Sequence, residues 1–271
     1  MTRFTVFGGD GFVGSHLVRY LRACGHEVEV PQRNADVQVR DLGVVIYSIG
    51  VTADFRRRQF DAIEAHVQRF REVVTSARYE SLVYLSSTRL YRYGRATQED
   101  APIVVRPREA DDLYAISKCM GESIALTVAP RCKVVRLSNV YGDDFASDNF
   151  LSSIIRDALR QKHVELQTAF SSAKDYISVD EVCELLLRIS LDGREQIYNV
   201  ASGISTSHGE ICKAIARVTA ATFEAVANAP EIRDQPIDTS RISREFAFTA
   251  VPLVDQIEEI VVAFRKASVA I

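Results

Sequence analysis

Hydrophobic and polar positions follow two different periods along the first half of the chain. Short apolar runs rich in β-branched residues lie at 3–7, 26–30, 44–49, 82–86 and 133–137. Between them, apolar residues recur at helical spacing at 12–22, 60–77 and 113–129. This alternation is typical of a parallel sheet that is covered by helices. The pattern therefore predicts an α/β fold with five parallel strands.

The pattern loosens after residue 142. Helical stretches at 149–161, 181–190 and 253–266 are separated by strand-like runs at 174–179 and 196–200. No internal repeat, low-complexity tract or linker divides the chain, so we expect two lobes packed together rather than independent domains on a tether. The expected division is a larger lobe at 1–142 and a smaller C-terminal lobe at 143–271, interleaved with the first.

Composition excludes several classes of protein. With 47% hydrophobic and 25% charged residues in 271, the chain has the composition of a folded globular protein. A formal net charge of -3 offers no broad positive field, which argues against nucleic acid as the main partner. No segment approaches the roughly 18 uninterrupted apolar residues of a membrane span, and we expect a cytoplasmic protein.

The cysteines suggest no chemistry of their own. The five are scattered singly, without a CxxC pair or a Cys/His cluster at metal-ligand spacing. We expect reduced thiols and no metal site. Cys119 follows a lysine that is discussed below, and a packing role is its simplest interpretation.

A glycine-rich segment stands where the first strand meets the first helix. Gly8, Gly11 and Gly14 fall at GxxGxxG spacing in GGDGFVG. The first can make a tight turn, the second lets the backbone approach a diphosphate, and the third lets the helix pack closely on the strand. The helix amides from Phe12 and Val13 onward would face the phosphates. A glycine-rich turn without a ligand is the alternative, but the strand–turn–helix setting predicts a dinucleotide-binding, Rossmann-type doubly wound lobe.

The residues at the end of the second predicted strand indicate whether NAD or NADP is preferred. An acidic residue there accepts ribose hydroxyls and favours NAD, whereas a basic residue can neutralise a 2′-phosphate. Gln32 and Arg33 occupy this place, with Arg40 a further candidate. They favour NADP over NAD, although Arg33 could instead stack on adenine or face solvent.

A candidate catalytic set follows the fourth and precedes the fifth predicted strand. Tyr114 and Lys118 are four residues apart and hence on one face of a helix, while Ser87 ends a strand at the edge where a ligand crevice is expected. A nearby ammonium can lower the pKa of a phenol, so that the phenol exchanges a proton with a hydroxyl or carbonyl oxygen. Ser87 can donate a hydrogen bond to the same oxygen. An amphipathic helix with a snorkelling lysine is the structural alternative.

Several motifs together resemble those of one family. They are GGDGFVGSHL, LSSTRLY, YAISK, RLSNVYG, KDYISVDEV and YNVASG, which span nearly the whole chain. They resemble the extended short-chain dehydrogenase/reductase family, in its NAD-dependent epimerase/dehydratase branch, which acts on nucleotide sugars. The resemblance implies a homodimer and a substrate-binding C-terminal lobe.

The resemblance also implies roles for individual residues. It makes Ser87, Tyr114 and Lys118 catalytic. It places further residues along the cofactor, namely Asp41, Leu42, Ser48, Ile49 and Gly50. The residues implied to contact the nucleotide sugar are Ser87, Thr88, Asn139, Lys174 and Arg233. Lys174 stands where relatives usually have arginine, and both Lys174 and Arg233 could instead be solvated charges. His66 stands where relatives often have asparagine, and we expect a buried, satisfied histidine.

The resemblance also narrows the reaction. Members that are 4,6-dehydratases carry an Asp-Glu pair after the catalytic hydroxyl residue, where this chain has Thr88 and Arg89. That difference argues against dehydration. Two reactions remain, which are reduction of a 4-keto nucleotide sugar and 4-epimerisation with tightly bound NAD. The non-acidic strand end and the short lobe favour the reductase. A cofactor-sensing regulator without turnover is the alternative of another class, and the intact Tyr114/Lys118 pair argues against it.

Overall fold

The chain divides into two compact units, each assembled from three segments. The computed structural model describes residues 1–271 except 34, 38–39, 52–56, 110, 129–130 and 270–271. Unit 1 comprises Met1–Ser138, Val179–Val200 and Asp238–Phe248, and unit 2 comprises Asn139–Ser178, Ala201–Ile237 and Thr249–Ile271.

Unit 1 is built on a six-stranded parallel sheet with the order β2-β1-β3-β4-β5-β9. The strands are β1 (Arg3–Phe7), β2 (Glu27–Glu29), β3 (Val44–Tyr47), β4 (Ser81–Ser87), β5 (Cys132–Leu137) and β9 (Ile197–Val200). The predicted Rossmann-type α/β class is confirmed. All five strands predicted in the first half of the chain lie in this sheet, and the run at 196–200 returns from the second half to pair with β5 as a sixth.

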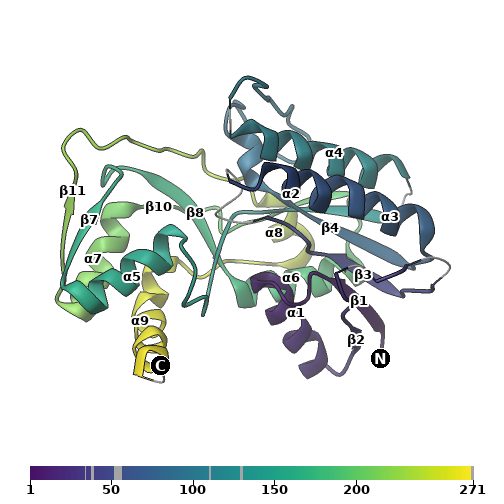
Figure 1. The fold of residues 1–271 in the computed structure, drawn as a ribbon, viewed down its shortest axis with the longest axis horizontal. Coiled ribbons are helices and arrows are strands. Elements are labelled where there is room, and N and C mark those ends of the chain that lie inside the picture. Colours follow the sequence, from purple (N-terminus) through teal and green to yellow (C-terminus); the bar gives the residue numbers. More distant parts are fainter. Residues whose placement is uncertain (34, 38–39, 52–56, 110, 129–130, 270–271) are drawn as a thin grey trace. The chain divides into compact units, whose positions relative to one another are not determined.

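Helices cover both faces of this sheet (Figure 1). α1 (Phe12–Ala23) and α6 (Val179–Asp192) pack against each other on one face. On the other lie α2 (Gln59–Ile63), the π-helical segment η1 (Glu64–Gln68), α3 (Arg69–Ser76) and α4 (Asp112–Val128). The apolar core under α3 and α4 includes Tyr47, Phe70 and Tyr84, all with 0% exposure. η2 (Thr88–Tyr91) follows β4, and α8 (Ser240–Phe246) contacts β9.

The single helix predicted at 60–77 is interrupted by η1, for a local reason. Two tyrosine hydroxyls from the sheet donate to successive carbonyls of η1: Tyr47 to Ala65 O at 2.6 Å and Tyr84 to His66 O at 3.3 Å. A side chain that inserts into the backbone ladder of a helix displaces its regular hydrogen bonds. Ala65 and His66 are consequently turned into the interior of unit 1.

The described part of unit 2 contains two small sheets and three helices. One sheet has the order β10-β8-β6, with β6 (Asn139–Tyr141), β8 (Ala173–Ser178) and β10 (Ser205–Ser207). The other pairs β7 (His163–Leu166) with β11 (Thr222–Ala225). The helices α5 (Phe150–Gln161), α7 (His208–Thr219) and α9 (Leu253–Val269) share one apolar core. A capping box of Ser207 and Glu210 fixes the start of α7.

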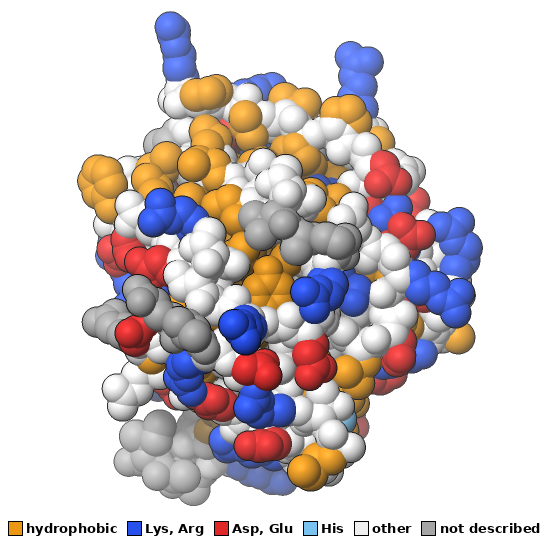
Figure 2. All heavy atoms as spheres, turned by 90° about the vertical axis from the view of Figure 1, so that its right-hand side faces the viewer, with side chains coloured by type: hydrophobic (Ala, Val, Ile, Leu, Met, Phe, Trp, Pro, Cys, Tyr) orange, Lys and Arg blue, Asp and Glu red, His pale blue; other side chains and the backbone are white. Residues whose placement is uncertain are grey.

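Three further properties of the described residues bear on function. None of their helices is long and apolar enough to cross a membrane. Among them, no group of three His, Cys, Asp or Glu side chains is placed to hold a metal ion. On the face in Figure 2, basic and acidic side chains are interspersed rather than gathered into a field of one sign.

Candidate active site

Three strand ends meet at one edge of the unit 1 sheet. β1, β3 and β4 are parallel and adjacent, and they end at Phe7, Tyr47 and Ser87. Gly8 and Ser48 follow the first two directly. Because ligands of open α/β sheets bind beyond the carboxyl ends of the strands, a ligand-binding site is expected at this edge of the sheet.

The glycine turn after β1 has no room for side chains. Gly8 has a φ of +80°, and a Cβ on it would lie 2.9 Å from Ile49 N. A Cβ on Gly14 would lie 2.1 Å from Gly8 O, which is an impossible contact. A Cβ on Gly11 would have only one near neighbour, Gly8 O at 3.3 Å. Gly8 and Gly14 are therefore required by the fold, whereas Gly11 leaves its outer side open for a close approach.

The beginning of α1 fits a diphosphate. Gly11 is its N-cap residue and supplies no side-chain cap, and the first turn carries no acidic residue. The first intrahelical bond is from Ser15 N to Gly11 O at 2.8 Å. The amides of Phe12, Val13 and Gly14 therefore have no acceptor within the helix, and they stand at its positive end. A turn that excludes side chains beside such amides has the properties of a dinucleotide cradle.

The segment after β3 lies against this turn. Ser48 Oγ donates to Phe7 O at 2.7 Å, and Ser48 N donates to the same oxygen at 2.9 Å. These bonds hold the end of β3 to the end of β1. Ile49 is half-buried and Gly50 is exposed. The structure thus brings Ser48, Ile49 and Gly50 to the same edge as the glycines.

Asp41 and Leu42 lie elsewhere, and their predicted place along the cofactor needs correction. Both precede β3, so they stand at the amino ends of the strands. Asp41 forms an ion pair with Arg3 at 3.3 Å, and Arg3 begins β1. Leu42 has 0% exposure and packs in the core. The edge that carries Gly8 is the opposite one, and neither residue faces it.

The loop after β2 carries the two residues that bear on cofactor choice. Gln32 and Arg33 are both exposed. Arg40, the further candidate for a 2′-phosphate, instead forms an ion pair with Glu29 of β2. Of the two basic residues that favoured NADP in the sequence, Arg33 is therefore the one that remains a candidate for binding a 2′-phosphate.

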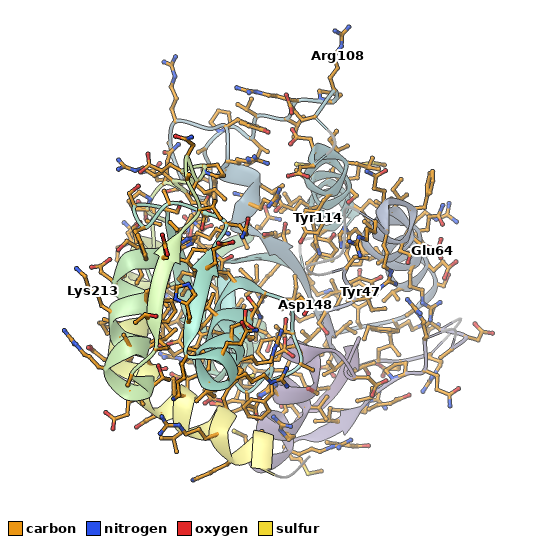
Figure 3. The ribbon with its side chains drawn as sticks, turned by 60° about the vertical axis from the view of Figure 1, so that its left-hand side comes forward. Tyr47, Glu64, Arg108, Tyr114, Asp148 and Lys213 are labelled. Atoms are coloured by element: carbon orange, nitrogen blue, oxygen red, sulfur yellow. The ribbon has the colours of Figure 1, made fainter. Side chains whose placement is uncertain are left out.

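Ser87 and Tyr114 are in contact. The Ser87 side chain hydrogen-bonds the Tyr114 phenol from the end of β4, while the phenol is presented by α4 (Figure 3). Burial raises the pKa of Tyr114, and the Ser87 hydrogen bond and the charge of Arg89 oppose the rise. In this structure it is Arg89, and not Lys118 as expected, whose charge lowers the phenol pKa. Arg89 is itself held by Asp111 at 3.0 Å.

Lys118 is buried one helical turn from Tyr114. Its Nζ donates to Leu85 O at 2.8 Å and lies 5.1 Å from the centre of the Tyr84 ring. Burial lowers the pKa of Lys118 to about 7, and the negative charge of Glu122 acts in the opposite direction. A lysine with such a pKa changes charge near neutral pH, which is unusual outside functional sites.

His66 adjoins this pair. Its ring meets the Tyr114 ring edge to face, with 5.2 Å between the centroids, and its Nδ1 lies 2.9 Å from Ser117 Oγ. Burial lowers the pKa of His66 to about 2, and Lys118 adds to the effect. The prediction of a buried histidine is confirmed. The prediction that it is satisfied is wrong for Nε2, which has no hydrogen-bond partner among the described residues.

Comparison with known proteins bears directly on this geometry. The model of the NAD dependent epimerase/dehydratase family matches residues 4–201. The chain belongs to that family. It is therefore an NAD(P)-dependent oxidoreductase of the extended short-chain dehydrogenase/reductase type, and the resemblance found in the sequence is confirmed.

Individual relatives are distant. The mitochondrial NADH dehydrogenase [ubiquinone] 1 alpha subcomplex subunit 9 of Dictyostelium discoideum is 30% identical over 161 residues, which cover 55% of this chain and 44% of that protein. The dTDP-4-dehydro-6-deoxy-D-allose reductase of Streptomyces bikiniensis is 25% identical, with 96% of this chain and 95% of that protein covered. The structure of MoeE5 in complex with UDP-glucose and NAD has a TM-score of 0.82 at 20% identity, covering 98% and 99% of the two chains.

A buried ion pair in this member of the epimerase/dehydratase family holds α4, the helix that carries Tyr114 and Lys118, and the sequence motifs did not reveal it. Glu122 of α4 accepts from Arg136 of β5 at 2.9 and 2.7 Å, and both side chains are almost fully buried. Arg136 also donates to the Tyr91 hydroxyl at 2.6 Å. The available signal was an arginine inside the apolar strand KVVRL, together with a glutamate one helical turn after Lys118.

The other residues predicted to bind substrate lie in both units of the chain. Thr88, half-buried, begins η2 in unit 1. In unit 2, Asn139 Nδ2 donates to Asp175 O at 2.7 Å, and Lys174 precedes that aspartate on β8. Arg233 pairs its backbone with Ala173, the first residue of β8, and its side chain bonds Glu231 at 2.8 Å. The structure thus gathers Asn139, Lys174 and Arg233 around one strand.

Proposed function

We propose that the chain is a nucleotide-sugar 4-ketoreductase that uses NADP in preference to NAD. The observation that carries the proposal is the hydrogen-bonded Ser87/Tyr114 pair with Lys118 behind it, at the strand edge that also carries the glycine turn. The S. bikiniensis reductase, matched over nearly its whole length, supports the sugar substrate. Arg33 beside Gln32 supports NADP.

The chain's own residues support the direction of reaction. Since burial raises the pKa of Tyr114, the phenol holds its proton at neutral pH and can deliver it to a carbonyl oxygen. The Ser87 hydroxyl can donate a hydrogen bond to the same oxygen as charge develops there. A nicotinamide cofactor on the glycine turn and the first amides of α1 would supply the hydride.

We also propose that residues on and beside strands β6 and β8 bind the substrate. Asn139 is proposed to contact the nucleotide sugar, and Lys174 and Arg233 to attract its diphosphate. Thr88, beside the catalytic serine, is proposed to contact the sugar. A homodimer and a cytoplasmic location belong to the same proposal.

Stoichiometry tests the reaction. A reductase consumes one NADPH for each 4-keto nucleotide sugar converted, which the loss of absorbance at about 340 nm and product chromatography measure together. The Tyr114→Phe variant, which removes the proton but keeps the ring, is expected to lose at least a hundredfold in kcat. It should bind NADPH as tightly as the unaltered enzyme in a fluorescence titration.

Conversion of a 4-hydroxy sugar without net change in cofactor would instead show the epimerase. Full turnover in Tyr114→Phe would remove the phenol from the chemistry. Binding of cofactor with no turnover of any nucleotide-sugar ketone or alcohol would show the regulator.

A further inference from the structure

His66 contains a buried nitrogen for which the proposed mechanism has no use. The side chain has 0% exposure, and Nε2 is unpartnered among the described residues. Such a group weakens the folded state, so it is expected where a moving side chain or a ligand completes its hydrogen bonding. The question is whether Nε2 offers a hydrogen or a lone pair.

The hydrogen bonds of Ser117 show that Nε2 of His66 carries a lone pair. The Ser117 hydroxyl donates its one hydrogen to Tyr114 O at 2.8 Å. Its oxygen must therefore accept the bond from His66 Nδ1 at 2.9 Å. The proton of the neutral imidazole consequently sits on Nδ1, and Nε2 carries a lone pair. Burial keeps the pKa of His66 near 2, so this tautomer persists across the physiological range.

The lone pair borders the same small space as the lysine. A Cβ on Gly50 would lie 3.6 Å from His66 Nε2 and 3.8 Å from Lys118 Nζ, and apart from the neighbours of Gly50 in the chain these are the described atoms within 4 Å. Lys118 donates one of its three hydrogens to Leu85 O. An acceptor and an ammonium with hydrogens to spare thus both lie within 4 Å of one position beside Gly50.

We propose that His66 Nε2 is a second fixed acceptor for the Lys118 ammonium, reached by a small rotation of the lysine about its terminal bonds. His66 is then a positioning residue. Together with Leu85 O it fixes the ammonium against the Tyr114 helix, and as an uncharged acceptor it stabilises the charged form of the lysine. The inference holds for the cofactor-free chain and goes beyond the ketoreductase proposal, because it does not depend on the substrate.

Among the residues that the structure describes, Lys118 is the charged group that acts on the His66 ring. Tyr114 and Lys118 face it from α4, and the Tyr84 hydroxyl reaches the His66 carbonyl from β4. The acidic residues of α2, η1 and α3 are exposed to solvent, namely Asp61, Glu64 and Glu72. On α4 the buried Glu122 acts on Lys118 and raises its pKa.

The pKa of Lys118 in the cofactor-free protein tests the proposal. The chain has six lysines, and their ¹³Cε signals can be followed by NMR, with that of Lys118 identified by its loss in Lys118→Met. In His66→Leu, which removes the acceptor, the Lys118 pKa is expected to fall by about one unit. In His66→Gln, whose amide oxygen reaches near the place of Nε2, at least half of that fall should be restored.

Gly50→Ala provides an independent variant. Its methyl group would be in ordinary contact with both nitrogens and would occupy space into which Lys118 would turn, so we expect the same fall without any change to His66. The matched control is His208→Leu, which removes another buried histidine with an unpartnered Nε2, in unit 2. It should leave the Lys118 signal unchanged. A Lys118 pKa that stays constant in Gly50→Ala, and in whichever His66 variants fold, would overturn the proposal, whether or not the enzyme reduces sugars.

Discussion

Gly11 and Gly14 belong to one turn but meet different obstacles, and this predicts different defects. In Gly14→Ala the new methyl would overlap Gly8 O, so we expect the free energy of unfolding to fall by about 3 kcal/mol. In Gly11→Ala the backbone is compatible with alanine, at φ −76°, and the loss of stability should stay below about 1 kcal/mol. The Gly11→Ala methyl instead obstructs the approach of a diphosphate and should weaken cofactor binding at least tenfold.

Urea unfolding and a fluorescence titration with NADPH measure the two effects separately. Each variant serves as the control for the other. Unaltered cofactor affinity in Gly11→Ala would argue against the glycine turn as the diphosphate site.

At the residue scale, the sequence predicted those groups whose position follows from the end of a strand or from one helical turn. Gly8, Ser87 and Tyr114 are of this kind. Asp41 was misplaced because its role was carried over from the family resemblance, whereas in this chain it precedes β3 and stands at the amino end of the sheet, beside Arg3. The partners of His66 lie on other elements, so the sequence could not show that one of its nitrogens is unsatisfied.

At the element scale, the Glu122–Arg136 pair fastens α4, the helix that carries Tyr114 and Lys118, to β5. In Glu122→Gln the guanidinium remains buried without its counter-charge, so we expect a loss of about 3–5 kcal/mol in the free energy of unfolding. Because the charge of Glu122 raises the pKa of Lys118, that pKa should also fall below about 7. Urea unfolding and NMR titration of the lysines check the two results.

The matched control is Glu184→Gln. Glu184 pairs with Arg188 at 3.1 Å on α6, where both side chains are substantially exposed, and its removal should cost less than about 0.5 kcal/mol. Equal losses of unfolding free energy in Glu122→Gln and Glu184→Gln would show that burial does not determine how much an ion pair stabilises this protein.

Elements with strong local periodicity were predicted well, and those that depend on distant partners were not. The helices α1 and α4 and the strands β1, β4 and β5 lie close to their predicted ranges. The predicted helix at 60–77 missed η1, because the tyrosines that disturb it come from β3 and β4. β9 was recognised as a strand but not as part of the central sheet, since no local pattern says which sheet a short apolar run will join.

At the scale of the whole molecule, each unit contains a buried histidine whose pKa is depressed, about 2 for His66 in unit 1 and about 4 for His208 in unit 2. The unfolded chain takes up these protons near pH 6.5, whereas the folded chain does not. The folded pKa is the lower one, so stability is lost as the pH falls below about 6.5. Each histidine is expected to cost about 2 kcal/mol between pH 7 and pH 5.

His208→Asn tests this expectation. The amide can replace Nδ1 in the 2.8 Å bond to Thr168 but does not titrate, so the loss of stability between pH 7 and pH 5 should shrink by about 2 kcal/mol in urea unfolding. His163 also contacts a threonine through Nδ1 but is exposed, and His163→Asn is the matched control variant. An unaltered pH dependence in His208→Asn would contradict the interpretation.

The three-segment construction of unit 1 has a consequence for how the protein is made. β9 joins the sheet only after some 200 residues have been synthesised, and α8, which contacts it through Phe246 and Tyr198, follows later still. Until then the outer edge of β5 is unpaired on the ribosome. Such edges invite pairing with other chains, so the nascent protein is exposed to aggregation while the residues between β5 and β9 are being synthesised.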